Sequence, residues 1–108
     1  MAKYVFIQSR DPFSSVEAAH DVELVSELAR AGSEVTLFLV QNGVLPARRS
    51  ARSEALSALA RSGVRVLADD FSLRVRGITA ARLAPGVEVG SVEAVLDAMC
   101  EGGKAVWH

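Results

Sequence analysis

The residues best suited to chemistry follow directly after short apolar runs. They are Ser9, Arg10 and Ser14 after residues 4–7, Asn42 after residues 35–40, and Asp69 after residues 64–67. A guanidinium group and two hydroxyl groups at the start of a helix are suited to binding a small anion. An amide and a carboxylate beside them would bind a cation or a hydrogen-bond donor. The alternative is that Ser14 only caps a helix and that the others are solvated loop residues.

Other reactive side chains are few. Cys100 is the only cysteine, so the chain cannot form an internal disulfide bond. It ends a predicted helix, where the dipole disfavours a thiolate, and a lone cysteine there is usually a small buried apolar residue. Asp69 and Asp70 are adjacent and could bind Mg²⁺ or act as a base, although such a pair more often forms a turn. His20 and His108 lack the partners of a catalytic triad, and we expect no metal site and no cofactor.

The elements that must position these residues alternate between strands and helices. Helix one begins with the capping box at residues 14–17 and ends at Gly32. A second helix is expected over residues 46–61, and residues 71–78 favour a short helix that ends at Gly77. In the last helix, which Ser91 caps, one inward face is predicted for Val92, Val95, Leu96 and Met99. Short apolar runs predict strands at residues 4–7, 35–40, 64–67, 87–89 and 104–107.

This alternation predicts the fold class. Strand–helix–strand units with short connections form parallel sheets that helices cover on both faces. We therefore expect residues 1–108 to form one α/β domain, three-layered and doubly wound. Its mostly parallel sheet would have about five strands in a flavodoxin-like arrangement. Ligands bind such sheets beyond the carboxyl ends of the strands, where Arg10, Asn42 and Asp69 are expected.

Composition and charge exclude several classes of partner. The 108 residues include 12 basic and 13 acidic ones, so the formal net charge is −1 and no overall field attracts nucleic acid. Arg48, Arg49 and Arg52 form a local basic cluster without interleaved aromatic residues, which is either a solvated face or a docking patch. No apolar run reaches the roughly 20 residues of a membrane-spanning helix, so we expect a cytoplasmic protein.

Three segments resemble one known family. They are residues 38–44, residues 63–67 with the later step Arg76-Gly77-Ile78, and the closing residues 105–107. Together they resemble the DsrE/DsrF-like proteins over nearly the whole chain. The resemblance implies a flavodoxin-like fold, a homo-oligomer (trimer or hexamer) and possible partner proteins in a sulfur relay. Members of that family carry a persulfide for tRNA thiolation or sulfur oxidation.

The resemblance also identifies a missing residue. In the members that transfer sulfur, an acceptor cysteine follows the third strand, about eight residues before the Arg-Gly step, and this position is Asp69 here. Aspartate cannot form a persulfide. The first hypothesis is therefore a non-catalytic subunit, or a member that binds a small ligand or partner around Asn42 and Asp69. The second is a sulfurtransferase or persulfide carrier that acts through Cys100, or with a partner chain that supplies the usual cysteine.

Overall fold

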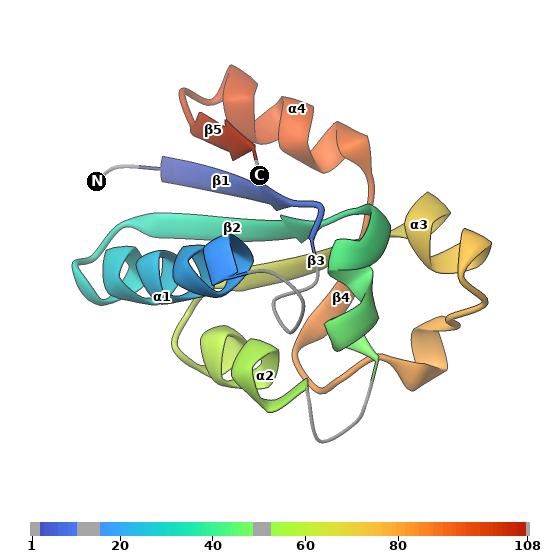
Figure 1. The fold of residues 1–108 in the computed structure, drawn as a ribbon. Coiled ribbons are helices and arrows are strands. Elements are labelled where there is room, and N and C mark those ends of the chain that lie inside the picture. Colours follow the sequence, from blue (N-terminus) through green and yellow to red (C-terminus); the bar gives the residue numbers. More distant parts are fainter. Residues whose placement is uncertain (1–2, 11–15, 49–52, 108) are drawn as a thin grey trace.

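Parallel strands form the centre of the protein (Figure 1). The computed structural model describes residues 3–10, 16–48 and 53–107. In these residues five strands pair in the order β4-β3-β2-β1-β5, and every pairing is parallel. The strands are β1 (Lys3–Gln8), β2 (Glu34–Leu39), β3 (Arg65–Asp69), β4 (Val87–Gly90) and β5 (Lys104–Trp107).

Helices connect the strands, which confirms the expected α/β class. They are α1 (Val16–Arg30), α2 (Glu54–Arg61), α3 (Asp70–Val75) and α4 (Val92–Cys100), with 3₁₀ turns η1 (Gln41–Ala47) and η3 (Ala80–Arg82). The sheet grows in chain order from β1 to β4, and α4 then returns the chain so that β5 pairs with the other side of β1. In flavodoxin itself β1 lies between β2 and β3, so the sheet here reverses at a different place. None of the described helices has the length and apolar character needed to cross a membrane.

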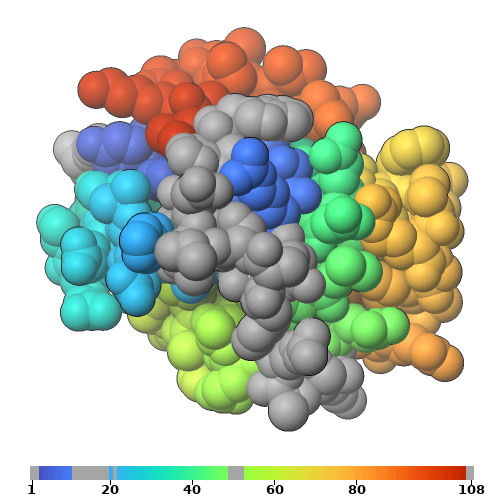
Figure 2. All heavy atoms as spheres, viewed as in Figure 1, coloured from blue at the N-terminus to red at the C-terminus, as the bar shows by residue number. Residues whose placement is uncertain are grey.

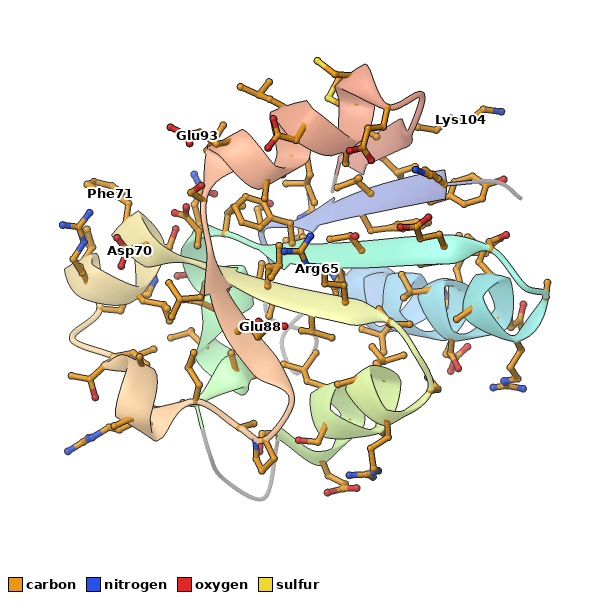
Figure 3. All side chains as sticks on the ribbon, turned by 180° about the vertical axis from the view of Figure 1, so that it is seen from behind. Arg65, Asp70, Phe71, Glu88, Glu93 and Lys104 are labelled. Atoms are coloured by element: carbon orange, nitrogen blue, oxygen red, sulfur yellow. The ribbon has the colours of Figure 1, made fainter. Side chains whose placement is uncertain are left out.

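The two faces of the sheet are covered unequally. On the first face α1 and α2 pack against residues such as Phe6 and Leu37. On the second face Val95 of α4 packs against Val5, Ile7, Phe38, Val40 and Leu67. Among the described helices, α4 alone supplies buried apolar contacts there. Figure 3, which views the molecule from behind, shows Arg65 and Glu88 on β3 and β4, and both side chains are exposed.

The segment after β2 differs from its prediction. One helix was expected over residues 46–61, but α2 begins at Glu54, and Gln41–Ala47 forms the 3₁₀ turn η1. Pro46 lies inside that turn and has no N–H group to continue an α-helix. Gly43 donates its N–H to the Val40 oxygen three residues earlier, at 2.9 Å. Arg49 and Arg52 of the expected basic cluster lie outside the described residues, and Arg48 is exposed.

The last helix also differs from its prediction. Of the four apolar residues expected to face inward, only Val95 is buried, while Val92, Leu96 and Met99 are 59%, 54% and 47% exposed. Only a narrow side of α4 contacts the sheet, and Ala94 and Ala98 complete that contact beside Val95. The other apolar residues of α4 lie outside the contact.

The two ends of α4 also differ from their predictions. Cys100 is exposed, contrary to the expectation of a buried residue. Ser91 occupies the N-cap position but makes no side-chain capping hydrogen bond.

Candidate functional site

The carboxyl ends of three neighbouring strands bring the predicted site residues to one edge of the sheet. Gln8 of β1 is in register with Leu39 of β2, and Leu39 is in register with Ala68 of β3. The residues that follow these positions, Ser9 and Asn42 among them, therefore leave the sheet at the same edge. This placement is the one that the order of elements predicts for a ligand site.

The side chain of Asp69 forms hydrogen bonds within the protein. Its side chain is buried, and Oδ2 accepts hydrogen bonds from the backbone N–H of Ser72 at 3.0 Å and from the Ser72 hydroxyl at 2.8 Å. Asp69 is thus the N-cap of α3. Ser72 is the third residue of the helix, and its backbone N–H has no acceptor within the helix, so the Asp69 carboxylate supplies one. One of the two carboxylate oxygens of Asp69, Oδ2, is therefore engaged twice within the protein.

Ser72 also joins α3 to the end of β2. Its hydroxyl oxygen accepts a hydrogen bond from the backbone N–H of Gln41 at 2.8 Å. Gln41 has a φ of 51°, and it is the one residue other than glycine with a positive φ in the part of the chain described. A left-handed conformation costs free energy in a residue with a side chain, so the surrounding contacts must hold it. The Ser72 hydroxyl is one such contact.

Arg76 connects this network to Asn42. Its guanidinium group donates to the carbonyl oxygen of Ser72 at 3.2 Å and to Oδ1 of Asn42 at 3.1 Å. Asn42 is exposed and Arg76 is half-buried, so this side of the network faces solvent. Asn42 and Asp69, which the sequence suggested as parts of one site, are therefore linked through Ser72 and Arg76.

The loop after β2 lies tightly against the end of β1. The backbone N–H of Val40 donates to the carbonyl oxygen of Gln8 at 2.9 Å. A Cβ atom on Gly43 would overlap the same carbonyl oxygen, so only glycine fits at this position. This close approach sets where Gln41 and Asn42 leave the sheet.

Comparison with known proteins agrees with this architecture. A sequence model of the DsrE/DsrF-like family matches residues 2–107. The chain belongs to the DsrE/DsrF-like family. A search of curated proteins found no match.

Two solved structures share the fold across their whole length. The protein of unknown function MTH1491 from Methanobacterium thermoautotrophicum is 26% identical, with a TM-score of 0.87 and full coverage of both chains. The ychN protein from E. coli is 21% identical, with a TM-score of 0.89 and again full coverage of both chains. At 21% identity the second likeness supports the fold alone.

The remaining site residues of this DsrE/DsrF-like chain lie around the network. After β1, Ser9 is half-buried and Arg10 is exposed at the same edge of the sheet. Ser14, the predicted helix cap, lies outside the described residues. In the described part of the chain no three His, Cys, Asp or Glu side chains are close enough together to hold a metal ion. Ser72 was missed as a site residue, although the spacing Asp69-x-x-Ser72 is that of a helix cap.

Cys100 lies at the opposite edge of the sheet from Asp69. Helix α4 starts just after the carboxyl end of β4 and ends just before the amino end of β5, with Cys100 as its last residue. The next residue, Glu101, forms an ion pair of 3.3 Å with Lys3 at the amino end of β1. Nine helical residues rise about 13 Å along the axis. Cys100 therefore lies about the length of α4 away from the edge of the sheet that holds Asp69.

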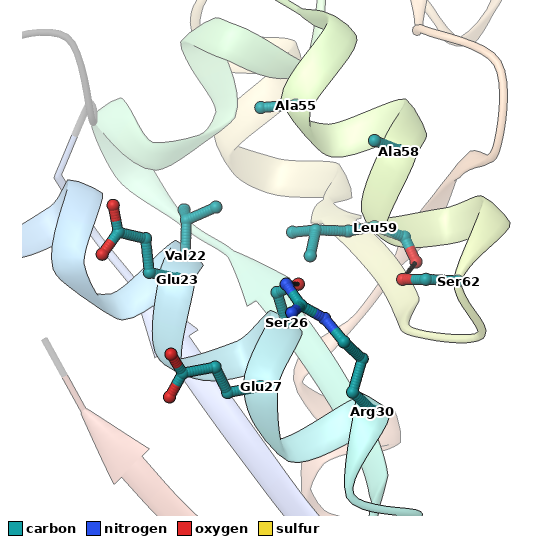
Figure 4. Close-up of a pocket in the computed structure, with 9 residues that line it drawn as sticks. All are labelled: Val22, Glu23, Ser26, Glu27, Arg30, Ala55, Ala58, Leu59 and Ser62. Atoms are coloured by element: carbon teal, nitrogen blue, oxygen red, sulfur yellow. Dashed lines mark hydrogen bonds between the residues drawn. The ribbon is translucent and has the colours of Figure 1, made fainter.

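A groove between α1 and α2 contains none of the predicted site residues (Figure 4). Val22 and Leu59 contribute apolar surface to it. Arg30 donates to the Ser26 hydroxyl at 3.1 Å, while the Ser62 hydroxyl donates to the Leu59 carbonyl oxygen at 2.8 Å. One N–H of Arg30 and the Ser62 hydroxyl are thus engaged within the protein. His20, also on α1, is exposed.

Proposed function

We propose that this DsrE/DsrF-like protein is a non-catalytic subunit, one that binds a small ligand or a partner and has no sulfur-transfer step. One observation carries the proposal: at the position that the family resemblance assigns to the acceptor cysteine stands Asp69, whose carboxylate caps α3. At this position Asp69 stabilises the first turn of α3 instead of carrying a persulfide. The proposal places the protein in the cytoplasm as a homo-oligomer, a trimer or hexamer, beside partners of a sulfur relay.

The chemistry of sulfur transfer supports this proposal. A persulfide forms when a thiolate attacks the outer sulfur of a donor persulfide, and the donor's inner sulfur leaves as a thiolate. A carboxylate at Asp69 cannot carry sulfane sulfur in this way. Cys100 has a sulfur atom, but it lies at the other edge of the sheet, away from Asn42 and Arg76.

The proposed ligand is a small anion held at the carboxyl edge. The proposed binding residues are Ser9, Arg10, Ser14, Asn42 and Asp69. Arg10 is exposed at this edge of the sheet, and the guanidinium group of Arg76 lies beside Asn42. Two cationic groups are therefore present near the proposed anion site. Asp69 acts indirectly, because it holds Ser72 and so the loop that carries Asn42. Inorganic phosphate and thiosulfate are suitable probes of the site.

A sulfur-loading experiment tests the missing transfer step. The protein is incubated with a low-molecular-weight persulfide donor, and its intact mass is measured for the wild type, for Cys100→Ala, and for Asp69→Cys in the Cys100→Ala background. We expect no sulfur adduct on the first two and an adduct on the third. An adduct on the wild type that Cys100→Ala abolishes would overturn the proposal in favour of a carrier that acts through Cys100, the second candidate, which the exposure of that thiol favours.

An NMR titration tests the ligand site. Phosphate or thiosulfate is added to ¹⁵N-labelled protein, and we expect the amide signals of Arg10 and of Gln41 to Gly43 to shift in a saturable way. Asn42→Ala with Arg10→Gln should weaken the response at least tenfold. Saturable shifts confined to other parts of the sheet, or no saturation with either anion, would refute a small-anion site at this edge.

A further inference from the structure

Large exposed apolar side chains are concentrated on three elements in the second half of the chain, α3, β4 and α4. Within the described residues seven are exposed, and six of these belong to α3, β4 and α4: Phe71, Val75, Val89, Val92, Leu96 and Met99. The seventh, Leu24, lies on α1. Single exposed apolar residues are ordinary, but a concentration on neighbouring elements marks an interaction surface.

The register of the sheet brings the two helices together. Asp69 of β3 pairs with Gly90 of β4, so α3 and α4 leave the same edge of the sheet from adjacent strands. Figure 3 shows Phe71 of α3 and Glu93 of α4 at one corner of the molecule, and Figure 2 shows α4 along the top and α3 at the right, with part of η1 between them on that side.

Each helix presents its apolar residues as a stripe. Phe71 and Val75 are one turn apart on α3, opposite the buried Leu73. On α4 the residues Val92, Leu96 and Met99 are spaced four and three apart, beside the buried Val95. We call the two stripes together the α3–α4 face, defined by Phe71, Val75, Val92, Leu96 and Met99.

The two helices that form this face carry different charges. On α4 all charged residues are acidic, and Glu93 and Asp97 form no ion pair with any described residue. On α3 the exposed Arg74 lies next to Val75, and among the described residues its ion-pair partner is Asp70, at 3.3 Å. Exposed pairs of this kind contribute little, so Arg74 can exchange Asp70 for another carboxylate at small cost. The face thus has an acidic side on α4 and a cation on α3.

We propose that the α3–α4 face binds the same face of a second copy of this chain, with α3 of one copy against α4 of the other. In this arrangement Arg74 meets Glu93 of the other copy, while the apolar stripes of the two copies cover each other. A face with a cation on one helix and free carboxylates on the other is complementary to itself when the copies are paired this way. Such a two-fold contact joins subunits in pairs. The inference therefore deepens the homo-oligomer of the proposed function by naming the contact that would join two trimers into a hexamer, and it is independent of the ligand site.

The first experiment removes the apolar contact. Molar mass is measured by light scattering during size exclusion for the wild type, for Leu96→Glu and for the control Leu24→Glu, which alters an exposed leucine outside the face. We expect the wild type and the control to have the mass of a hexamer of the 11.5 kDa chain, and Leu96→Glu to have the mass of a trimer with an unchanged circular dichroism spectrum. An unchanged mass for Leu96→Glu would overturn the assignment of the face. A monomeric wild type would overturn the oligomer as well, whereas sulfur loading tests the missing transfer step separately.

The second experiment tests which helices meet. Glu93→Arg and Arg74→Glu should each weaken association about tenfold in sedimentation equilibrium, because each places like charges opposite one another. The double variant, which swaps the two charges, should recover most of the wild-type affinity. If the double variant associates no better than the single ones, α3 does not face α4 across the contact, and the proposal fails.

Discussion

Asp69→Ala is the substitution that best separates a structural aspartate from a functional one. The alanine leaves two buried donors, the N–H and the hydroxyl of Ser72, without the carboxylate oxygen that accepts from both. Ser72 itself is buried, so water cannot easily replace the lost acceptor. Asp69→Asn is the matched control, because asparagine is an equally good helix cap and keeps one side-chain oxygen as an acceptor.

The expected loss follows from these two hydrogen bonds. Removal of an N-cap costs about 1 kcal/mol, and a hydroxyl that loses a charged acceptor costs about 2 kcal/mol more. We therefore expect Asp69→Ala to lower the free energy of unfolding by about 3 kcal/mol. Asp69→Asn loses only the contribution of the charge, about 1 kcal/mol. In a domain of this size these losses lower the melting temperature by about 10–20 °C and about 5 °C, respectively.

The free energy of unfolding of both variants is measured by urea unfolding followed by circular dichroism. The slope of that free energy against urea concentration should stay unchanged, as expected when unfolding remains two-state. Ser72→Ala should lose a similar amount, and its combination with Asp69→Ala should cost clearly less than the sum, because both variants break the same hydrogen bonds. Full stability of Asp69→Ala would refute the cap, and equal losses for alanine and asparagine would show that charge, not the acceptor, is what α3 requires.

Four further substitutions test the fold by the same unfolding assay. Gly43→Ala should cost about 2 kcal/mol, because the new Cβ overlaps the Gln8 carbonyl oxygen; wild-type stability would refute that close approach. Val95→Ala should also cost about 2 kcal/mol, whereas the exposed Val92→Ala should change stability by less than about 0.5 kcal/mol, and equal effects would contradict the orientation of α4. Cys100→Ala should leave stability within about 0.5 kcal/mol, and a larger loss would show that the thiol is packed.

The strands were predictable because each is a short apolar run between polar turns, and parallel sheets bury both faces of such runs. Their ends also predicted which edge collects Asn42 and Asp69. The contacts within that edge were not predictable in the same way. Ser72 meets Gln41 across 31 residues of sequence, and Arg76 meets Asn42 across 34. A local pattern has no information about partners so far apart.

Two errors of prediction have a common physical cause. The helix expected from residue 46 is replaced at its start by η1, in which Pro46 has no N–H group to donate and Gly43 lies against the Gln8 carbonyl group, a contact that periodicity cannot detect. The inward face of α4 was overestimated because periodicity gives the width of an apolar stripe but not the width of the surface that covers it. In both segments a contact with another element, which the local pattern does not show, contributes to the difference.

The coverage of the second face by α4 has a consequence for folding during synthesis. Strands β1 to β4 all precede α4 in the chain, so they leave the ribosome before the helix that covers Val5, Phe38 and Leu67. Until residues 92–107 follow, β1 has an open edge where β5 will pair, and one apolar face of the sheet meets solvent. Such an intermediate is prone to associate through both features. The edge and the face are closed together once α4 and β5 have been made.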